Sequence, residues 1–208
     1  MDADARRSLL HEKLVEAAER TIAARGLPAL KARDLAREAG CAVGAIYNVF
    51  PDLDGLILAV NMRTLALFEA AIAGSGEGAA PSRGSEAEAA VNDLARLALA
   101  YLAFAQAHVP RWRALFQHRM ASGRVPEWYR AEQGRLFRYI EVPLARLCPD
   151  LAGEERTLRA RSLFSSTHGI VSLGLDEKLM ALPPAALARE LEAVVRALGR
   201  GLASGPGP

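Results

Sequence analysis

The sequence predicts an all-α fold. Apolar residues recur with the 3.6-residue period of a helix along almost the whole chain, and no segment alternates apolar and polar residues as a half-buried strand does. Glycine and proline separate the periodic segments. The 208 residues, 51% of them apolar, suffice for one or two domains with a buried core. We expect about nine helices in two domains, 1–52 and 53–203, followed by a disordered tail, 204–208.

The first 52 residues are predicted to form three helices. The first carries an apolar stripe and ends before Gly26, a residue that tolerates the left-handed conformation of a helix cap. Two short helices follow, over 32–39 and 42–50, with a turn at Gly40 between them. Two short helices around a glycine turn are typical of a helix-turn-helix motif.

The remaining chain is predicted to form six longer helices. Asp52 is the expected N-cap of a helix over 53–73, and Ser85 opens a capping box for a helix over 86–108. The glycine-rich stretch 74–85 is expected to be a flexible connector. The other helices are expected over 110–122, 126–147 with a kink at Pro143, 153–178 and 184–203.

Several classes of protein are excluded by what the sequence lacks. Apolar stretches such as 97–105 reach about half the length that a membrane span needs, and the N-terminus lacks the apolar core of a signal peptide. Cys41 and Cys148 are isolated, which is typical of a reducing compartment and not of a zinc site. We therefore expect a cytoplasmic protein that has no membrane partner and uses no cofactor.

A set of spaced residues distinguishes the segment 30–56. It reads LKARDLAREAGCAVGAIYNVFPDLDGL, and the positions concerned are Leu35-Ala36, Ala39-Gly40, Gly44, Tyr47, Phe50 and Leu56. An aliphatic-alanine pair, an alanine-glycine turn, a small-residue helix with Gly and Tyr, and then Phe and a new helix resemble the TetR family of transcriptional regulators. The resemblance covers about the first 60 residues. Thr167-His168-Gly169 is also similar to the histidine-glycine element of one TetR C-terminal subclass.

The resemblance implies a ligand-responsive regulator, by default a repressor. Such a protein binds a palindromic operator in double-stranded DNA as a homodimer, because one small helix-turn-helix domain has limited affinity alone. A small-molecule effector bound among the middle helices would tilt the helix over 53–73 and release the operator.

The side chains of the second short helix suit DNA binding. Gly44 permits close approach of the backbone to the major groove, and Asn48 can make two hydrogen bonds to adenine. Tyr47 can bind a phosphate through its hydroxyl. The predicted DNA-contacting residues are Lys31, Arg33, Ala42, Val43, Gly44, Ala45, Tyr47 and Asn48. The alternative is that the small residues merely face solvent and that Tyr47 packs against the first helix.

The segment departs from the family pattern in its caps and charges. Lys31 and Ala42 stand where side-chain acceptors usually cap the two short helices. Leu53 replaces the lysine that commonly binds phosphate, and Asp52 and Asp54 flank it. Residues 1–50 hold eight basic and seven acidic side chains, and Arg6 and Arg7 among them are expected to form a mobile basic arm. We expect few phosphate contacts and a shallow salt dependence of binding.

The last two helices are predicted to form the dimer interface. The final helix has one continuous aliphatic stripe, and small residues recur along the helix before it, where they permit close helix packing. The predicted interface residues are Ser162, Ser166, Gly169, Ile170, Leu191, Val194, Val195 and Leu198. The alternative is that both stripes pack only within the monomer.

Aromatic residues concentrate in the middle of the chain and predict an apolar ligand pocket. The predicted effector-binding residues are Tyr101, Phe104, His108, Trp112, Phe116, Phe137, Phe164 and His168. No two histidines share a helix at a spacing that suits a metal, so no metal site is expected. The alternative is ordinary core packing without a ligand.

Two other functions are alternatives to transcriptional regulation. Acidic pairs such as 52/54 and 154/155 fall at predicted helix ends, where capping explains them, so an enzyme is not expected. Leu53 and its acidic neighbours keep open a helical ligand-binding or adaptor protein with weakened DNA affinity.

Overall fold

The computed structural model describes residues 2–75, 85–176 and 182–204, and every regular element within them is helical. Ten α-helices and one short 3-10 helix lie in this part of the chain, which confirms the all-α prediction and adds one helix to it. Most of the predicted connector and nearly all of the predicted tail lie outside the described residues.

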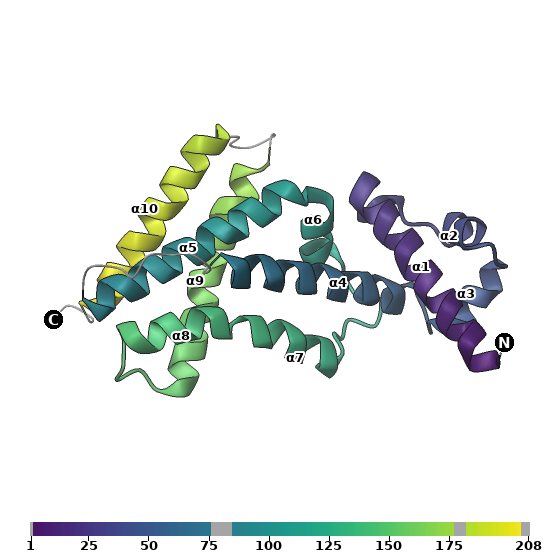
Figure 1. Ribbon diagram of the computed structural model, residues 1–208, viewed down its shortest axis with the longest axis horizontal. Coiled ribbons are helices and arrows are strands. Elements are labelled where there is room, and N and C mark those ends of the chain that lie inside the picture. The colour runs from purple at the N-terminus through teal and green to yellow at the C-terminus, as the bar shows by residue number, and fades with distance from the viewer. Residues whose placement is uncertain (1, 76–84, 177–181, 205–208) are drawn as a thin grey trace. The chain divides into compact units, whose positions relative to one another are not determined.

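The helices follow one another along the whole described chain (Figure 1). In order they are α1 (Ala3–Arg25), η1 (Leu27–Ala29), α2 (Ala32–Ala39), α3 (Val43–Val49), α4 (Leu53–Gly74), α5 (Glu86–Ala107), α6 (Val109–Gln117), α7 (Glu127–Leu136), α8 (Arg138–Leu147), α9 (Gly153–Gly174) and α10 (Pro184–Ala203). They form two compact units, which we call the first unit (1–67 and 107–130) and the second unit (68–106 and 131–208).

The first unit is built around α1, which packs against α2, α3 and α6 (Figure 1). Its core is a single cluster of apolar side chains, because each helix turns one stripe inward. The buried members are Leu14, Val15, Ala17, Ala18, Ile22, Leu35, Ala36, Ile46, Phe50, Leu56, Val60 and Ala114. The helix-turn-helix segment therefore shares one core with the start of α4 and with α6.

The helix ends have the chemistry that the sequence predicts. Gly40 caps α2 in the left-handed conformation, with φ 69° and ψ 38°, which turns the chain toward α3. The Asp52 Oδ1 atom accepts a hydrogen bond from the Gly55 amide at 2.8 Å and so caps α4. Lys31 and Ala42 stand at the N-caps of α2 and α3 and make no side-chain capping bond.

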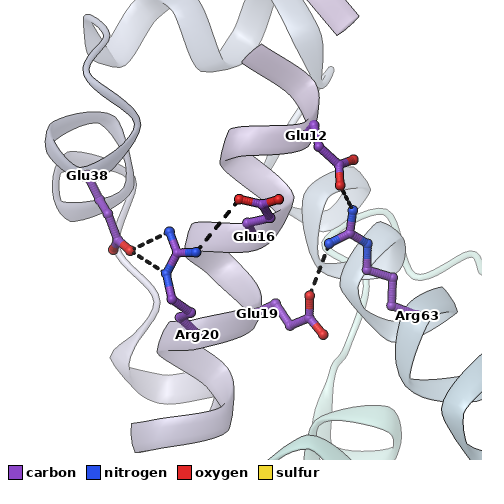
Figure 2. Close-up of polar contacts among 6 residues, drawn as sticks. All are labelled: Glu12, Glu16, Glu19, Arg20, Glu38 and Arg63. Carbon is purple, nitrogen blue, oxygen red and sulfur yellow. Dashed lines mark hydrogen bonds and ion pairs between the residues drawn. The ribbon is translucent and has the colours of Figure 1, made fainter. Parts of the chain in front are cut away.

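A cluster of ion pairs ties α1 to its neighbours in the first unit. Arg63 of α4 donates to Glu12 and to Glu19 of α1, the latter at 3.0 Å (Figure 2). The second oxygen of Glu19 receives Arg111 of α6 at 2.8 Å. Burial would lower the pKa of Arg63, but the hydrogen bonds that it donates to Glu19 and Glu12 outweigh this and raise the pKa. One arginine and one carboxylate thus connect three helices.

The boundaries of several elements differ from the sequence prediction. α1 begins at Ala3, with Asp2 as its N-cap, so Arg6 and Arg7 lie in a helix and form no mobile arm. α6 ends at Gln117, before the predicted 122, and α9 ends at Gly174, before the predicted 178.

The predicted helix 126–147 is two helices, and its break lies at Phe137 instead of Pro143. Phe137 keeps helical backbone angles, with φ −63° and ψ −21°, but its amide donates to the Gly134 carbonyl three residues back at 3.1 Å, so one tighter turn separates the two helices. Its ring packs edge-on against Phe164, with centroids 5.5 Å apart. Pro143 is buried inside α8, where the loss of one backbone hydrogen bond is tolerated.

Among the described helices, α4 alone is long and apolar enough to cross a membrane by length and composition. The apolar stretch considered in the sequence was 97–105, and α4 was not considered. In this protein its residues Leu56 and Val60 are fully buried in the core of the first unit. Arg63, which forms two ion pairs, and the buried Asn61 and Thr64 lie in the middle of the same helix. A core helix explains its composition.

The second unit packs α8, α9 and α10 against one another (Figure 1). α9 and α10 approach closely where Gly174 faces Leu187, because a Cβ atom at Gly174 would lie 2.5 Å from Leu187 Cδ1. Leu187 is 1% exposed, so its side chain is enclosed by other atoms of the core. The absence of a side chain at Gly174 therefore sets the spacing of this helix pair.

Replacing Gly174 by alanine should lower the free energy of unfolding by about 1–3 kcal/mol, because the new methyl group overpacks the contact with Leu187. Urea unfolding followed by circular dichroism measures the loss. Gly201→Ala in α10 is the control, since no atom lies within 4 Å of its Cβ position and alanine favours a helix. Equal midpoints for Gly174→Ala and the parent protein would contradict this account of the packing.

Candidate nucleic-acid interface and ligand site

Helix α3 has one buried face and one exposed face. Ile46 is fully buried and Phe50, which caps the helix, is 5% exposed, so these two side chains fix α3 to the core. On the other face Tyr47 is 50% exposed and Asn48 is exposed as well. Tyr47 therefore presents half of its surface to solvent, which does not favour the alternative that it packs against α1.

The small residues predicted to contact DNA divide by exposure. Ala42, Val43 and Gly44 are exposed at the start of α3, and Ala45 is half-buried. A Cβ atom at Gly44 would meet no atom within 4 Å, so the fold of the subunit does not require glycine there. Glycine inside a helix costs about 1 kcal/mol relative to alanine.

Some of the basic side chains around α2 and α3 are paired with carboxylates and others are not. Arg20 pairs with Glu38 at 2.9 Å and with Glu16, as Figure 2 shows, and Arg37 pairs with Asp34 at 2.7 Å. Lys31 and Arg33, two of the predicted DNA-contacting residues, are exposed. Within the described parts of the chain, neither of them makes an ion pair.

The acidic residues at the start of α4 are used within the first unit. The Asp54 side chain is 14% exposed, its Oδ2 atom accepts from the Ala121 amide at 2.7 Å, and its Oδ1 atom lies 3.5 Å from His118 Nε2. Asp52 caps the same helix. Of these two acidic residues, Asp52 is the exposed one.

Five of the predicted effector-binding residues come together in the second unit, and they form what we call the aromatic cluster with Phe68 of α4. Its members are Phe68, Tyr101, Phe104, Phe137, Phe164 and His168. Ring centroids of neighbours within it are 5.1–6.3 Å apart. Phe68 was missed in the sequence, although it is the one aromatic residue of α4.

Two polar groups lie inside the aromatic cluster. The Tyr101 hydroxyl and His168 Nδ1 are hydrogen-bonded at 2.7 Å, and the Phe164 ring stacks on the imidazole at 5.8 Å. Burial lowers the pKa of His168 from its usual value, because the charged imidazolium loses its hydration. The cluster therefore combines apolar rings with a neutral hydrogen-bonding pair, which is the composition of a small-molecule site.

The other three predicted effector-binding residues belong to the first unit. His108 is the N-cap of α6, Trp112 is 2% exposed, and Phe116 is 40% exposed. Trp112 and Phe116 contact each other with centroids 5.8 Å apart. In the described residues, no group of three or more metal-binding side chains comes together.

The predicted dimer-interface residues also differ in exposure. Val194 and Leu198 are 39% and 40% exposed, Ser162 and Ser166 are exposed, and Gly169 and Ile170 are half-buried. Two members need correction, because their side chains are already buried inside the subunit and have almost no surface left for a partner. These are Leu191, at 0% exposure, and Val195, at 5%.

Two exposed leucines of α9 were missed in the sequence. Leu158 is 57% exposed and Leu173 is 48% exposed. They continue the face that carries Ser162 and Gly169, and their spacing of three to four residues was the signal available in the sequence.

Solved structures of similar fold support this arrangement. The chain matches a protein of unknown function from Rhodococcus sp. RHA1 at 26% identity and TM-score 0.67, covering 93% of this chain and 95% of the other. It matches a TetR-like transcriptional regulator from the same organism at 20% identity and TM-score 0.60, covering 95% and 97%. The multidrug binding protein EbrR, solved in complex with imidazole, matches at 19% identity and TM-score 0.59, covering 95% and 96%. No curated protein matches the sequence.

Both parts of the sequence match known families. Residues 14–60 match the bacterial regulatory proteins of the tetR family, and residues 94–198 match the tetracyclin repressor-like C-terminal domain. Neither match distinguishes the histidine-glycine subclass suggested by His168 and Gly169. The second match alone spans half of the chain, and the first covers the helix-turn-helix segment described above. The chain therefore belongs to the TetR family of bacterial transcriptional regulators.

Proposed function

We propose that this DNA-binding regulator is a cytoplasmic repressor that holds a palindromic operator as a homodimer and releases it when a small apolar or aromatic molecule binds. The observation that carries the proposal is the exposed face of α3 with Tyr47 and Asn48, beside two cations without ion-pair partners in the described chain. Regulators of this family are not enzymes.

DNA contact is supported by the exposed residues around α2 and α3 that make no contacts needed for the fold. Lys31 and Arg33 have no competing carboxylate in the described chain, so they can each neutralise a phosphate without breaking an ion pair. Gly44 lowers the stability of α3, and the packing of the subunit does not require a glycine there. A glycine at this position does permit a close approach of the α3 backbone to the wall of a DNA groove. Asn48 then supplies the base-specific hydrogen bonds.

Dimer formation is supported by the exposed apolar side chains of α9 and α10. Leu158, Leu173, Val194 and Leu198 all leave large parts of their side chains in solvent in the single subunit. Small residues such as Ser162 and Gly169 lie among them and permit close helix contact. The interface we propose consists of these residues with Ser166 and Ile170, and it omits Leu191 and Val195.

Effector binding is supported by the aromatic cluster. Its rings and its Tyr101–His168 pair can hold a molecule with an apolar body and one hydrogen-bonding group. The similar fold of the imidazole complex of EbrR is consistent with a small heteroaromatic ligand among these helices.

A second candidate function is a ligand-binding or adaptor protein with weakened DNA affinity. It is favoured by Leu53, which stands where the family often has a phosphate-binding lysine, and by the near-neutral charge of residues 1–50. The inward position of Asp54 removes part of that argument.

Replacing Asn48 by alanine should weaken operator binding by about 1–3 kcal/mol, because one bidentate base contact is lost. Tyr47→Phe should weaken it less, since only a phosphate hydrogen bond is removed. Fluorescence anisotropy on an operator selected from random DNA measures both, with binding to unrelated DNA as the control. We expect a log–log salt slope shallower than roughly −8 per dimer. Absence of any binding at low salt would favour the adaptor function.

Replacing Leu198 by glutamate should convert the dimer to a monomer, because two like charges would be placed in an apolar two-fold interface. Sedimentation equilibrium at micromolar concentration measures the change. Ala185→Glu is the matched control, since Ala185 is exposed in the first turn of the same helix, outside the proposed interface. A parent protein that sediments as a monomer would refute the dimer.

At least one of the three compounds imidazole, indole and phenol should bind, and it should both raise the melting temperature of the protein and weaken its binding to the operator. The two effects go together because effector and operator affinities are thermodynamically coupled. Differential scanning fluorimetry and anisotropy measure the two effects. Phe164→Ala should reduce both, whereas Phe116→Ala, at an exposed ring of the first unit, should leave them unchanged. Unchanged melting and unchanged operator affinity with all three compounds would count against this ligand class.

A further inference from the structure

A cavity lies in the second unit, apart from the aromatic cluster, between the end of α4, α5 and α8. Its volume is about 440 Å³, within the range of pockets that hold small molecules. Its walls are Ile72, Ala73, Asp93, Arg96, Leu97, Arg138, Tyr139, Val142, Pro143 and Arg146. None of these residues belongs to the aromatic cluster.

The cavity lining is both cationic and apolar. Three arginines and one aspartate supply its charged groups, so the cations exceed the anions by two. Aliphatic side chains, the Tyr139 ring and the buried Pro143 cover the rest of the wall. An anionic group would be attracted to the arginines, and an apolar body would lie against Ile72, Leu97 and Pro143.

The one carboxylate of the cavity holds two of the arginines in place. Asp93 accepts from Arg96 at 3.0 Å and also from Arg146. Burial would raise the pKa of Asp93, but hydrogen bonds from Arg146 and Arg96 lower it, so this carboxyl group is ionised at neutral pH. Arg96 also donates a hydrogen bond from Nη1 to the Ser75 hydroxyl at 2.9 Å.

Two arginines keep hydrogen-bonding capacity after these contacts. Arg138 lines the cavity and is exposed, and in the described chain only its Nε atom, which donates to the Arg135 carbonyl at 3.3 Å, makes a hydrogen bond. The Nε atom of Arg146 is buried and has no partner in the described chain. Buried donors without partners are rare, because each loses its hydration without compensation.

We propose that this cavity binds a small organic carboxylate with an aliphatic body, whose oxygens are held by Arg138 and Arg146. A planar carboxylate can accept two parallel hydrogen bonds from a guanidinium, which suits the geometry of arginine better than that of lysine. The inference goes beyond the proposed effector site, because it assigns a separate set of residues and a ligand that carries a negative charge.

Isothermal titration calorimetry on the full chain with octanoate tests the proposal. Octanoate should bind at one site per subunit, while 1-octanol and octylammonium, which share its chain but lack the anion, should bind at least about tenfold more weakly. Inorganic phosphate should bind more weakly than octanoate, since it has no apolar part.

Variants assign the binding to this cavity. Arg138→Gln should weaken octanoate binding about tenfold, because it removes a charge without breaking the Asp93 ion pairs. Arg146→Lys keeps the charge near Asp93 but loses the buried Nε donor, and it should also weaken binding severalfold. Arg189→Gln is the matched control, since Arg189 is exposed on α10 and lies outside the cavity lining.

Three results would overturn the proposal. They are equal binding of octanol and octanoate, phosphate binding as tight as that of octanoate, and unchanged octanoate affinity in folded Arg138→Gln and Arg146→Lys. Circular dichroism establishes that each variant is folded. These readouts use no DNA and no aromatic ligand, so they are independent of the proposed repressor function.

Discussion

The Glu19 carboxylate is the contact on which the first unit depends. One of its oxygens receives Arg63 of α4 and the other receives Arg111 of α6, while its own helix, α1, forms the centre of the helix-turn-helix core. Its side chain is only 19% exposed, so the attraction is less screened by solvent than in a surface pair. Any movement of α4 or α6 must either carry α1 with it or break a partly buried ion pair.

This arrangement gives the family mechanism a physical path in this chain. The apolar core resists separation of the helices but permits small sliding, whereas directed ion pairs from α4 and α6 to one side chain fix their register along α1. Asp54 adds a second connection, because it binds the backbone just after α6 from the first turn of α4. The helix α4, which carries effector signals in the proposed mechanism, is thus tied to α1 through Arg63 and to the segment after α6 through Asp54.

The helix-turn-helix segment could be predicted from sequence because its signals are local. The cap at Gly40, the cap at Asp52 and the inward stripe around Ile46 each depend on residues a few positions apart. The break at Phe137 could not be predicted, because it is one tighter turn at a residue that keeps helical backbone angles, and Pro143 gave the stronger local signal. The pairing of Glu19 with Arg63 joins residues 44 positions apart, and no spacing rule reveals such contacts. Leu191 and Val194 share one stripe in the sequence, and only the packed structure separates buried from exposed members.

The exposed surface of α3 has a consequence for how such a regulator diversifies. Ala42, Val43 and Gly44 are exposed, and a side chain added at Gly44 would meet nothing within 4 Å. Substitutions there change the chemistry of the proposed DNA-contacting face with little cost to folding, while Ile46, in the same helix, is constrained by the core. Operator preference and stability can therefore evolve almost independently, and duplicated copies of such a gene can acquire new targets without first acquiring compensating mutations.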